Sequence, residues 1–128
     1  MVTKKLIAIF VLVGVLAGLV IWEQVYTDNA LNNMLTNIQS LEVELEAENL
    51  EQSRMLAQKI NDTWDKNEAI ICLFVDFRDI EQIGRQADLV VSHLGNEDFE
   101  LARVECNTLQ RVVETFKDIV KFDWQNIF

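Results

Sequence analysis

Apolar residues follow two patterns along the chain, one continuous and one periodic. Residues 6–22 form an unbroken apolar run that is preceded by Lys4 and Lys5. Beyond residue 30, apolar residues recur at spacings of three and four, which places them on one face of an α-helix. Proline is absent and there are only 4 glycines, so long helices are favoured over a fold with many turns. The pattern predicts an all-α protein with an N-terminal transmembrane helix, followed by an up-down antiparallel bundle of about four helices.

The apolar run has the length and the flanking residues of a membrane span. Seventeen residues (6 to 22) form a helix of about 26 Å, at the short end of what a hydrocarbon core of about 30 Å requires. Lysines at one end and Trp22 and Tyr26 at the other suit the two interfaces. A soluble core helix would show polar residues on its outward face, and this run has none. Val15-Leu16-Ala17 resembles a cleavage site, but the apolar run continues past it. We therefore predict an uncleaved signal anchor, with cleavage after Ala17 as the open alternative.

Basic residues predict the orientation of the span. After Lys4 and Lys5, no lysine or arginine occurs until Arg54. The positive-inside rule places the lysine-flanked end in the cytoplasm. We predict a single-pass cell-membrane protein with a cytoplasmic N-terminus (1–5), a transmembrane anchor (6–22) and an extracytoplasmic acidic helical domain (23–128).

Within the body, the apolar spacing predicts four helices. The first helix ends at a bend near residues 47–49, where the alternating glutamates of residues 42–48 interrupt the apolar stripe. Thr27-Asp28-Asn29 could cap a separate helix or lie inside one continuous with the span, and both possibilities stay open. The predicted stripes are Leu31, Leu35, Ile38, Leu41 and Leu45; Leu50, Ala57, Ile60 and Trp64; Ile70, Leu73, Phe77, Ile80, Gly84, Ala87, Val91 and Leu94; and Phe99, Ala102, Cys106, Leu109, Val113, Phe116 and Val120.

Local sequence features predict where these helices begin and end. Residues 65–67 form a polar break between the second and third helices. Gly95 is expected to end the third helix in a left-handed conformation, and Asn96 to cap the fourth. Gly84 lies in the middle of a helix, where glycine costs about 1 kcal/mol relative to alanine, so it predicts a close approach of two helices.

The charge of the body excludes some partners. Removing the two N-terminal lysines from the 11 basic residues leaves 9 against 21 acidic residues, a net charge of −12. Nucleic acid is excluded as a partner because its affinity depends on neutralising phosphates. Flat adsorption of the body onto an anionic bilayer is disfavoured because both are negatively charged, so contact with lipid is expected through residues 6–22.

No catalytic, cofactor-binding or metal-binding residues are predicted. His93 is the one histidine, and its place in the last turn of a helix indicates an interaction with the helix dipole. In a hairpin that turns at Gly95, Cys106 lies level with about residue 84. Cys72 is then about 18 Å away along the axis, too far for a disulfide. Both thiols are expected to be free and buried.

Two features suggest association with other molecules. Gly14 and Gly18 form a G-x-x-x-G pair, which lets another helix approach closely in lipid. Phe122, Trp124 and Phe128 form an aromatic C-terminal end that closes the core, or that contacts the bilayer interface or a membrane partner. Another membrane protein is the expected partner, and a homo-oligomer is compatible with the same residues. The partner, the oligomeric state and any ligand remain open.

The chain resembles a family of short, single-span helical membrane proteins of Gram-positive spore-forming bacteria, a domain of unknown function. The features shared are the lysine-flanked span, the segment Trp64-x-Lys66-Asn67-Glu68, the long third helix and the terminal Asn-Ile-Phe. The resemblance implies a partner in the membrane, often a multi-span protein, and no enzymatic chemistry. It gives no functional residues.

Together these features predict a non-enzymatic, membrane-anchored accessory protein that associates with another membrane protein. One alternative is a structural coiled-coil element of a cell-envelope or division complex, which requires an unbroken heptad seam. The other is an extracytoplasmic domain that senses a small ligand.

Overall fold

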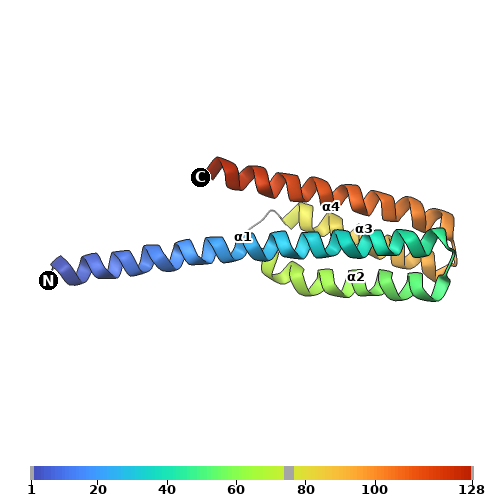
Figure 1. Cartoon of the computed structure of the whole chain (residues 1–128), viewed down its shortest axis with the longest axis horizontal. Helices are drawn as coiled ribbons and strands as arrows, with labels where there is room; N and C mark the ends of the chain where they lie inside the picture. Colours follow the sequence, from blue (N-terminus) through green and yellow to red (C-terminus); the bar gives the residue numbers. More distant parts are fainter. Residues whose placement is uncertain (1, 74–76, 128) are drawn as a thin grey trace.

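The computed structural model describes residues 2–73 and 77–127, and the side chains of residues 3–73 and 78–121. These residues form four α-helices and no strand: α1 (Val2–Glu46), α2 (Leu50–Ile71), α3 (Phe77–Gly95) and α4 (Phe99–Ile127). Each helix packs against two others, α1 and α3 each lying between α2 and α4 (Figure 1). This arrangement confirms the predicted all-α, up-down antiparallel bundle.

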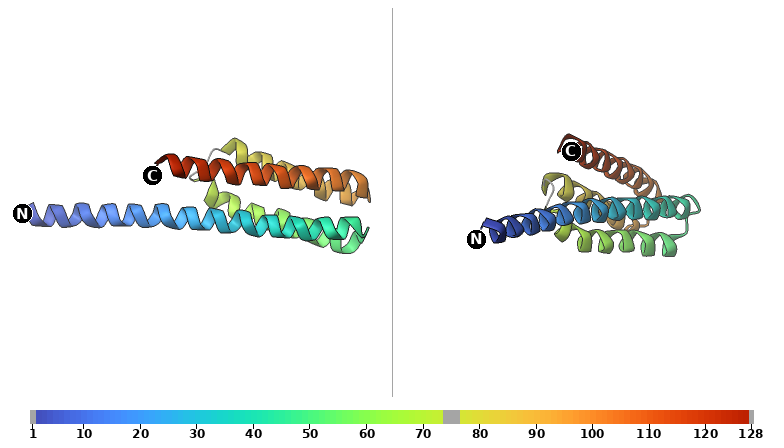
Figure 2. Two further views of the ribbon diagram at one scale, coloured as in Figure 1. Left: turned by 45° about the horizontal axis from the view of Figure 1, so that its top comes forward. Right: turned by 60° about the vertical axis from the view of Figure 1, so that its left-hand side comes forward.

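The N-terminal half of α1 projects beyond the other helices. Both views in Figure 2 show α1 continuing past the ends of α2, α3 and α4. Of the two possibilities for residues 27–29, the continuous helix is correct, because Thr27 lies inside α1 and its hydroxyl donates to Glu23 Oε1 (3.0 Å). The projecting segment is therefore fixed in rotation relative to the bundle.

Each helix contributes one apolar stripe to a single core. The stripe of α1 contains Leu31, Met34, Ile38, Leu41 and Leu45, and Trp64 of α2 is the largest of the fully buried side chains. The glutamate-rich segment is helical up to Glu46, and the chain then bends, as predicted. Asn49 begins α2 by accepting a hydrogen bond from the backbone N–H of Gln52. The fully described core residues of the other three helices are Ala57, Ile60, Trp64 and Ile71; Ile80, Ile83, Ala87, Val90 and Leu94; and Ala102, Cys106, Leu109, Val113, Phe116 and Val120.

The predicted break at residues 65–67 is wrong. α2 runs through it to Ile71, and α3 begins at Phe77 instead of Ile70. Asp65 and Lys66 are exposed, and Asn67 accepts a hydrogen bond from the Tyr26 hydroxyl (2.6 Å). Asp65 and Lys66 face outward, and Asn67 lies on the side of α2 that faces α1, where Tyr26 satisfies its side-chain oxygen, so the helix continues to Ile71 without a break.

The turn between α3 and α4 also differs from the prediction. Gly95 does not adopt a left-handed conformation; Glu97 does, with φ 59°. Asp98, not Asn96, caps α4, because its Oδ1 accepts from the backbone N–H of Leu101 (3.1 Å). Arg54 of α2 joins this turn by donating from Nε to the carbonyl oxygen of Leu94 (3.2 Å).

The predicted register between α3 and α4 is confirmed. Gln86 donates to the backbone carbonyl of Glu105 (3.0 Å) and to its carboxylate, so Cys106 lies near the level expected. Both cysteines are free; Cys106 is fully buried, but Cys72 is only half-buried because it lies just beyond the last helical residue of α2. Gly84 lies against a neighbouring helix as predicted: a Cβ built there would lie 3.5 Å from Trp64 Nε1.

Candidate functional site

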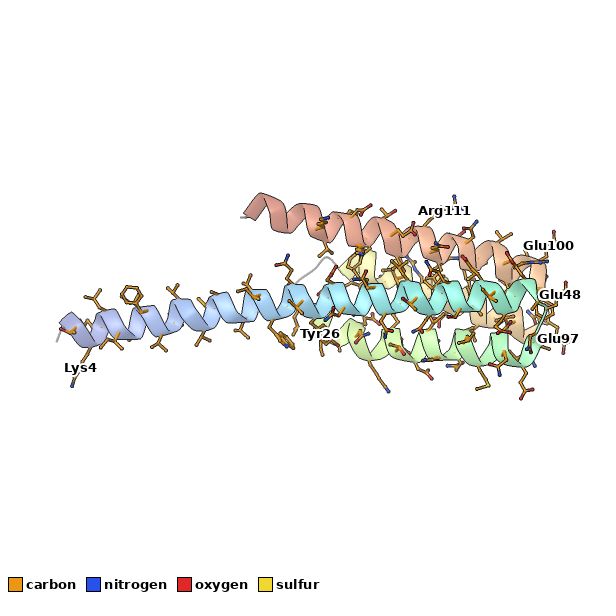
Figure 3. The ribbon with its side chains drawn as sticks, in the orientation of Figure 1. Lys4, Tyr26, Glu48, Glu97, Glu100 and Arg111 are labelled. Atoms are coloured by element: carbon orange, nitrogen blue, oxygen red, sulfur yellow. The ribbon has the colours of Figure 1, made fainter. Side chains whose placement is uncertain are left out.

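The apolar segment of α1 makes almost no contact with the rest of the described chain. Its large side chains are roughly half or more exposed, from Leu6 to Trp22 (50%). Lys4 lies near the projecting tip and Tyr26 lies where α1 enters the bundle (Figure 3). In the described residues, α1 is the one helix long and apolar enough to cross a membrane. This is the surface that most needs a covering other than water.

Gly14 and Gly18 are both on the projecting segment and both open to their surroundings. A Cβ built at either position would meet no heavy atom within 4 Å. Nothing in the described chain therefore requires glycine at these positions for its own packing. Their use as a helix-association site stays a prediction.

The C-terminal end of α4 returns to the level where the apolar segment ends. Lys117 Nζ donates to Asn32 Oδ1, which sets the register of these two antiparallel helices. Ile127 is ten residues beyond Lys117 and Trp22 is ten residues before Asn32, so the two lie near the same level. Phe122 and Trp124 belong to this last part of α4, but their side chains and all of Phe128 lie outside the described residues. Their role as contacts stays a prediction.

Two aromatic rings mark the boundary between the apolar segment and the bundle. The ring centroids of Trp22 and Tyr26 are 5.4 Å apart, with the planes tilted by 32°. Trp22 is half exposed, while Tyr26 is partly buried and donates its hydroxyl to Asn67 of α2. Amphipathic rings of this kind are enriched at the boundary between lipid and water.

A buried polar pair lies at the same end of the bundle, and the sequence analysis did not identify it. Glu23 and Thr27 are each 1% exposed and continue the core stripe outward from Leu31 in steps of four. Thr27 satisfies Glu23 Oε1, whereas Glu23 Oε2 has no hydrogen-bond partner among the described residues. Burial raises the pKa of the Glu23 carboxyl, and the hydrogen bond from Thr27 partly opposes this. The four-residue steps in the sequence could have revealed the pair.

Glu23→Gln should therefore make the protein more stable at neutral pH. The folded protein holds the Glu23 proton more tightly than the unfolded chain, where the pKa is near 4.5. The stability of the wild-type protein should fall as pH rises from 4.5 through the higher folded pKa. Glutamine keeps an acceptor for Thr27 but carries no charge. Urea unfolding of the full chain in detergent at pH 4 and pH 7 should show the variant gaining relative to wild type only at pH 7, and parallel pH dependences would contradict the assignment.

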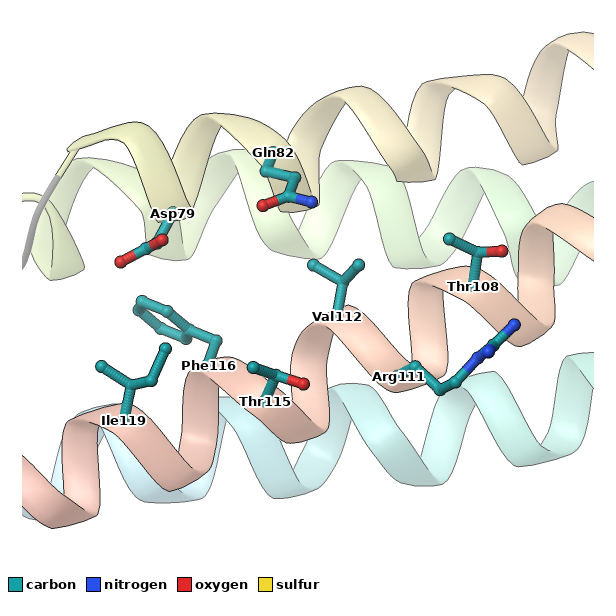
Figure 4. Close-up of a pocket in the computed structure, with 8 residues that line it drawn as sticks. All are labelled: Asp79, Gln82, Thr108, Arg111, Val112, Thr115, Phe116 and Ile119. Atoms are coloured by element: carbon teal, nitrogen blue, oxygen red, sulfur yellow. The ribbon is translucent and has the colours of Figure 1, made fainter.

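A groove on the bundle lies between α3 and α4, with a volume of about 350 Å³ (Figure 4). Val112, Phe116 and Ile119 give it an apolar wall, and in Figure 4 Asp79 and Arg111 lie far apart along it. Its remaining lining residues are Gln82, Thr108 and Thr115. None of these eight residues is a cysteine, serine or histidine, so the groove lacks the usual nucleophile and base pairing of covalent catalysis.

Titratable side chains in the described parts of the chain do not gather into a metal-binding cluster. Among them there is no group of three or more His, Cys, Asp or Glu side chains that could hold a metal ion. His93 lies in the last turn of α3, the position for which an interaction with the helix dipole was predicted. Burial, with the nearby Glu42 carboxylate adding to it, raises the pKa of the Cys106 thiol to about 12, so this thiol is protonated at neutral pH.

The fold and its surfaces define a class of protein: a four-helix bundle whose first helix extends into a segment able to cross a membrane. The chain belongs to the family described as a domain of unknown function, DUF4363, whose model matches residues 21–127. The matched residues include the whole bundle and leave most of the apolar segment outside. Neither the curated proteins nor the solved structures contain a match to this chain.

Proposed function

We propose that the protein is a non-enzymatic accessory protein, anchored by residues 6–22, that acts by associating with other helices in the cell membrane. The observation that carries this proposal is the apolar half of α1, exposed along its length and joined without interruption to a folded bundle. Because this segment is continuous with the bundle, the bundle is held at a constant distance from the membrane-spanning residues and cannot rotate independently of them. The surfaces available for association are the face of Gly14 and Gly18 and the C-terminal end of α4.

The proposed orientation puts the N-terminus in the cytoplasm and the bundle outside. Lys4 and Lys5 flank the span on one side. On the other side, the α1–α2 and α3–α4 turns carry acidic residues, and Glu48, Glu97 and Glu100 lie at the end of the bundle furthest from Lys4 (Figure 3). An origin in a Gram-positive spore-forming bacterium, which the family resemblance implies, fits a domain exposed on the outer surface of one cytoplasmic membrane.

Replacing Gly14 and Gly18 with isoleucine should weaken association with the partner helix. The branched side chains would hold the two backbones apart, because small residues are what permit close packing in lipid. Crosslinking in the native membrane, followed by identification of the captured protein by mass spectrometry, should show a several-fold lower yield for the double variant.

Leu16→Phe is the control, since Leu16 lies two residues from both glycines, and so on the opposite face of the same span, and the change also enlarges a side chain. Its yield should equal that of the wild-type protein. Equal capture by Gly14→Ile/Gly18→Ile and by wild type would remove the glycine face from the proposal.

The coiled-coil alternative receives less support from the fold. α2, α3 and α4 pack alongside the C-terminal half of α1, so the body is an antiparallel bundle and does not continue the span as a single rod (Figure 1). The ligand-sensing alternative would place its ligand in the groove between α3 and α4, where one carboxylate and one guanidinium, far apart from each other, give little selectivity.

A further inference from the structure

The outer face of α1 carries a stripe of exposed residues that reaches from the apolar segment to the far end of the bundle. Successive members are three or four residues apart, so they lie along one line on the helix. Every one of them is exposed in the folded chain. We call this set the outer stripe; it consists of Gly14, Gly18, Trp22, Val25, Asn29, Asn32, Thr36, Gln39 and Val43.

Most of the outer stripe points away from the other helices, and its edge toward α4 contains Asn32, which accepts a hydrogen bond from Lys117, and Val25, which lines a pocket with α4. Thr36 lies two residues from both Met34 and Ile38, and Val43 lies two residues from both Leu41 and Leu45, all four of which are core residues. Two residues correspond to about 200° around the helix axis. Because α1 is continuous, the glycines share this direction. A helix packed on Gly14 and Gly18 can therefore continue along the outer side of α1 beyond the membrane, passing Lys117 of α4 where it contacts Asn32.

Charge distinguishes the outer stripe from the outer faces of the other helices. None of its nine residues is charged, in a body with a net charge of −12. Each of the other helices carries charge at an equivalent position, midway between two core residues: Asp62 on α2, Arg85 on α3, and Arg111 and Asp118 on α4, although Met55, Ser92 and Val104 at such positions are uncharged. Solvation of an acidic bundle explains the four charged residues but gives no reason to exclude charge from α1. Val25 and Val43 are instead exposed apolar residues, at 53% and 65%.

We propose that the outer stripe is the interface with a second copy of this chain, the two α1 helices packing in parallel along their length. This rests on the proposed function, because two copies anchored in one membrane with the same orientation must be parallel. In a dimer with a two-fold axis parallel to the two α1 helices, each residue of the outer stripe lies close to the same residue of the second chain. Charged residues would repel their copies, whereas uncharged ones do not. A different partner of so acidic a protein would be expected to meet complementary charge, and this face offers none.

The chemistry of the outer stripe suits self-association. Gly14 and Gly18 allow two backbones to approach in lipid, and an asparagine such as Asn29 can both donate to and accept from its own copy. Asn32 is already held within the chain by Lys117 and by Asp28, to which its Nδ2 donates (3.4 Å). From Gly14 to Val43 the stripe is about 44 Å long, enough for several turns of paired helix.

A single-cysteine scan in native membranes tests the interface. Cys72→Ser provides the background, and Cys106 is kept because it is buried and its thiol stays protonated. Thr36→Cys and Val43→Cys place a thiol on the outer stripe. Ser92→Cys on α3 and Val104→Cys on α4 are matched controls, since both residues lie on exposed faces away from the core. Mild oxidation of the full-length protein is followed by non-reducing electrophoresis.

The stripe variants should form a disulfide-linked dimer with twice the monomer mass of 14.8 kDa. The yield of this dimer should be at least several-fold higher than for the control variants. Equal yields at all four positions would indicate random collision and would overturn the proposal. So would the absence of dimer at positions 36 and 43. A Thr36→Glu/Val43→Glu double variant should abolish the dimer measured by native mass spectrometry, and Ser92→Glu should not.

The outcomes also separate this inference from the proposed function. Thiols at positions 36 and 43 that crosslink to a different membrane protein, without the homodimer, would overturn self-association and leave the accessory role intact. A protein absent from the membrane fraction would overturn both.

Discussion

Trp64→Ala should remove about 3–5 kcal/mol from the free energy of unfolding, a large part of what a domain of this size has. Trp64 is 1% exposed and is the largest of the fully buried side chains. It packs against Gly84 of α3, where even a methyl group would be in contact with the indole. Truncation would leave a cavity at the contact between α2 and α3 that the surrounding helices can fill only in part.

Urea unfolding of the full-length protein in detergent, followed by circular dichroism, measures this loss. Trp64→Phe should lose less than half as much, because it keeps most of the ring and removes an indole N–H that has no partner among the described residues. Trp22→Ala is the matched control, since Trp22 is half exposed on the apolar segment, and its unfolding should be nearly unchanged. A loss below about 1 kcal/mol for Trp64→Ala would contradict the packing described.

The core of the bundle could be predicted because it depends on spacing alone. Leu31, Ile38, Leu41 and Leu45 were all identified from their period, and all are buried. The ends of helices were predicted less well. The connection from α2 to α3 contains no glycine or proline, and the apolar spacing from Ile70 through Leu73 to Phe77 continues across it, so no local signal separates the two helices there.

The turn between α3 and α4 shows a second limit. Glycine is the residue that best tolerates a left-handed conformation, so the prediction chose Gly95. The chain instead extends α3 to Gly95 and places Glu97 in that conformation, with the backbone N–H of Asp98 donating to the carbonyl oxygen of His93 (3.0 Å). Arg54 fixes this choice by binding the carbonyl oxygens of Leu94 and Gly95 from α2, a tertiary contact that no local pattern reveals.

At the candidate site, the apolar segment and its glycines could be predicted from the sequence. The direction in which the glycines face around the α1 axis, relative to the bundle, could not. That direction depends on α1 being continuous, which the residues around Thr27 left open. Glu23 was missed for the same reason, since its burial follows from the core stripe continuing beyond Leu31 to the end of the span.

Two acidic residues placed within the span should release the protein from the membrane. Leu12→Asp and Leu16→Asp lie near the centre of residues 6–22, where each aspartate costs about 2.5–3.5 kcal/mol on insertion. Together they would cancel much of the favourable free energy of transferring the apolar run into the membrane. Carbonate extraction should move the double variant from the membrane pellet to the soluble fraction. Val104→Asp, at an exposed position on α4, is the control and should stay in the pellet with the wild-type protein.

The placement of the chain across the membrane is tested most directly by protease treatment of intact spheroplasts that express the full-length protein with a tag at each end. We expect the C-terminal tag to be digested, the N-terminal tag to survive on a membrane-bound fragment, and no new N-terminus at Gly18. The Leu12→Asp/Leu16→Asp variant should keep both tags in the cytoplasm. A protected C-terminal tag on the wild-type protein, or a wild-type chain that begins at Gly18, would contradict an uncleaved anchor with the bundle outside the cell.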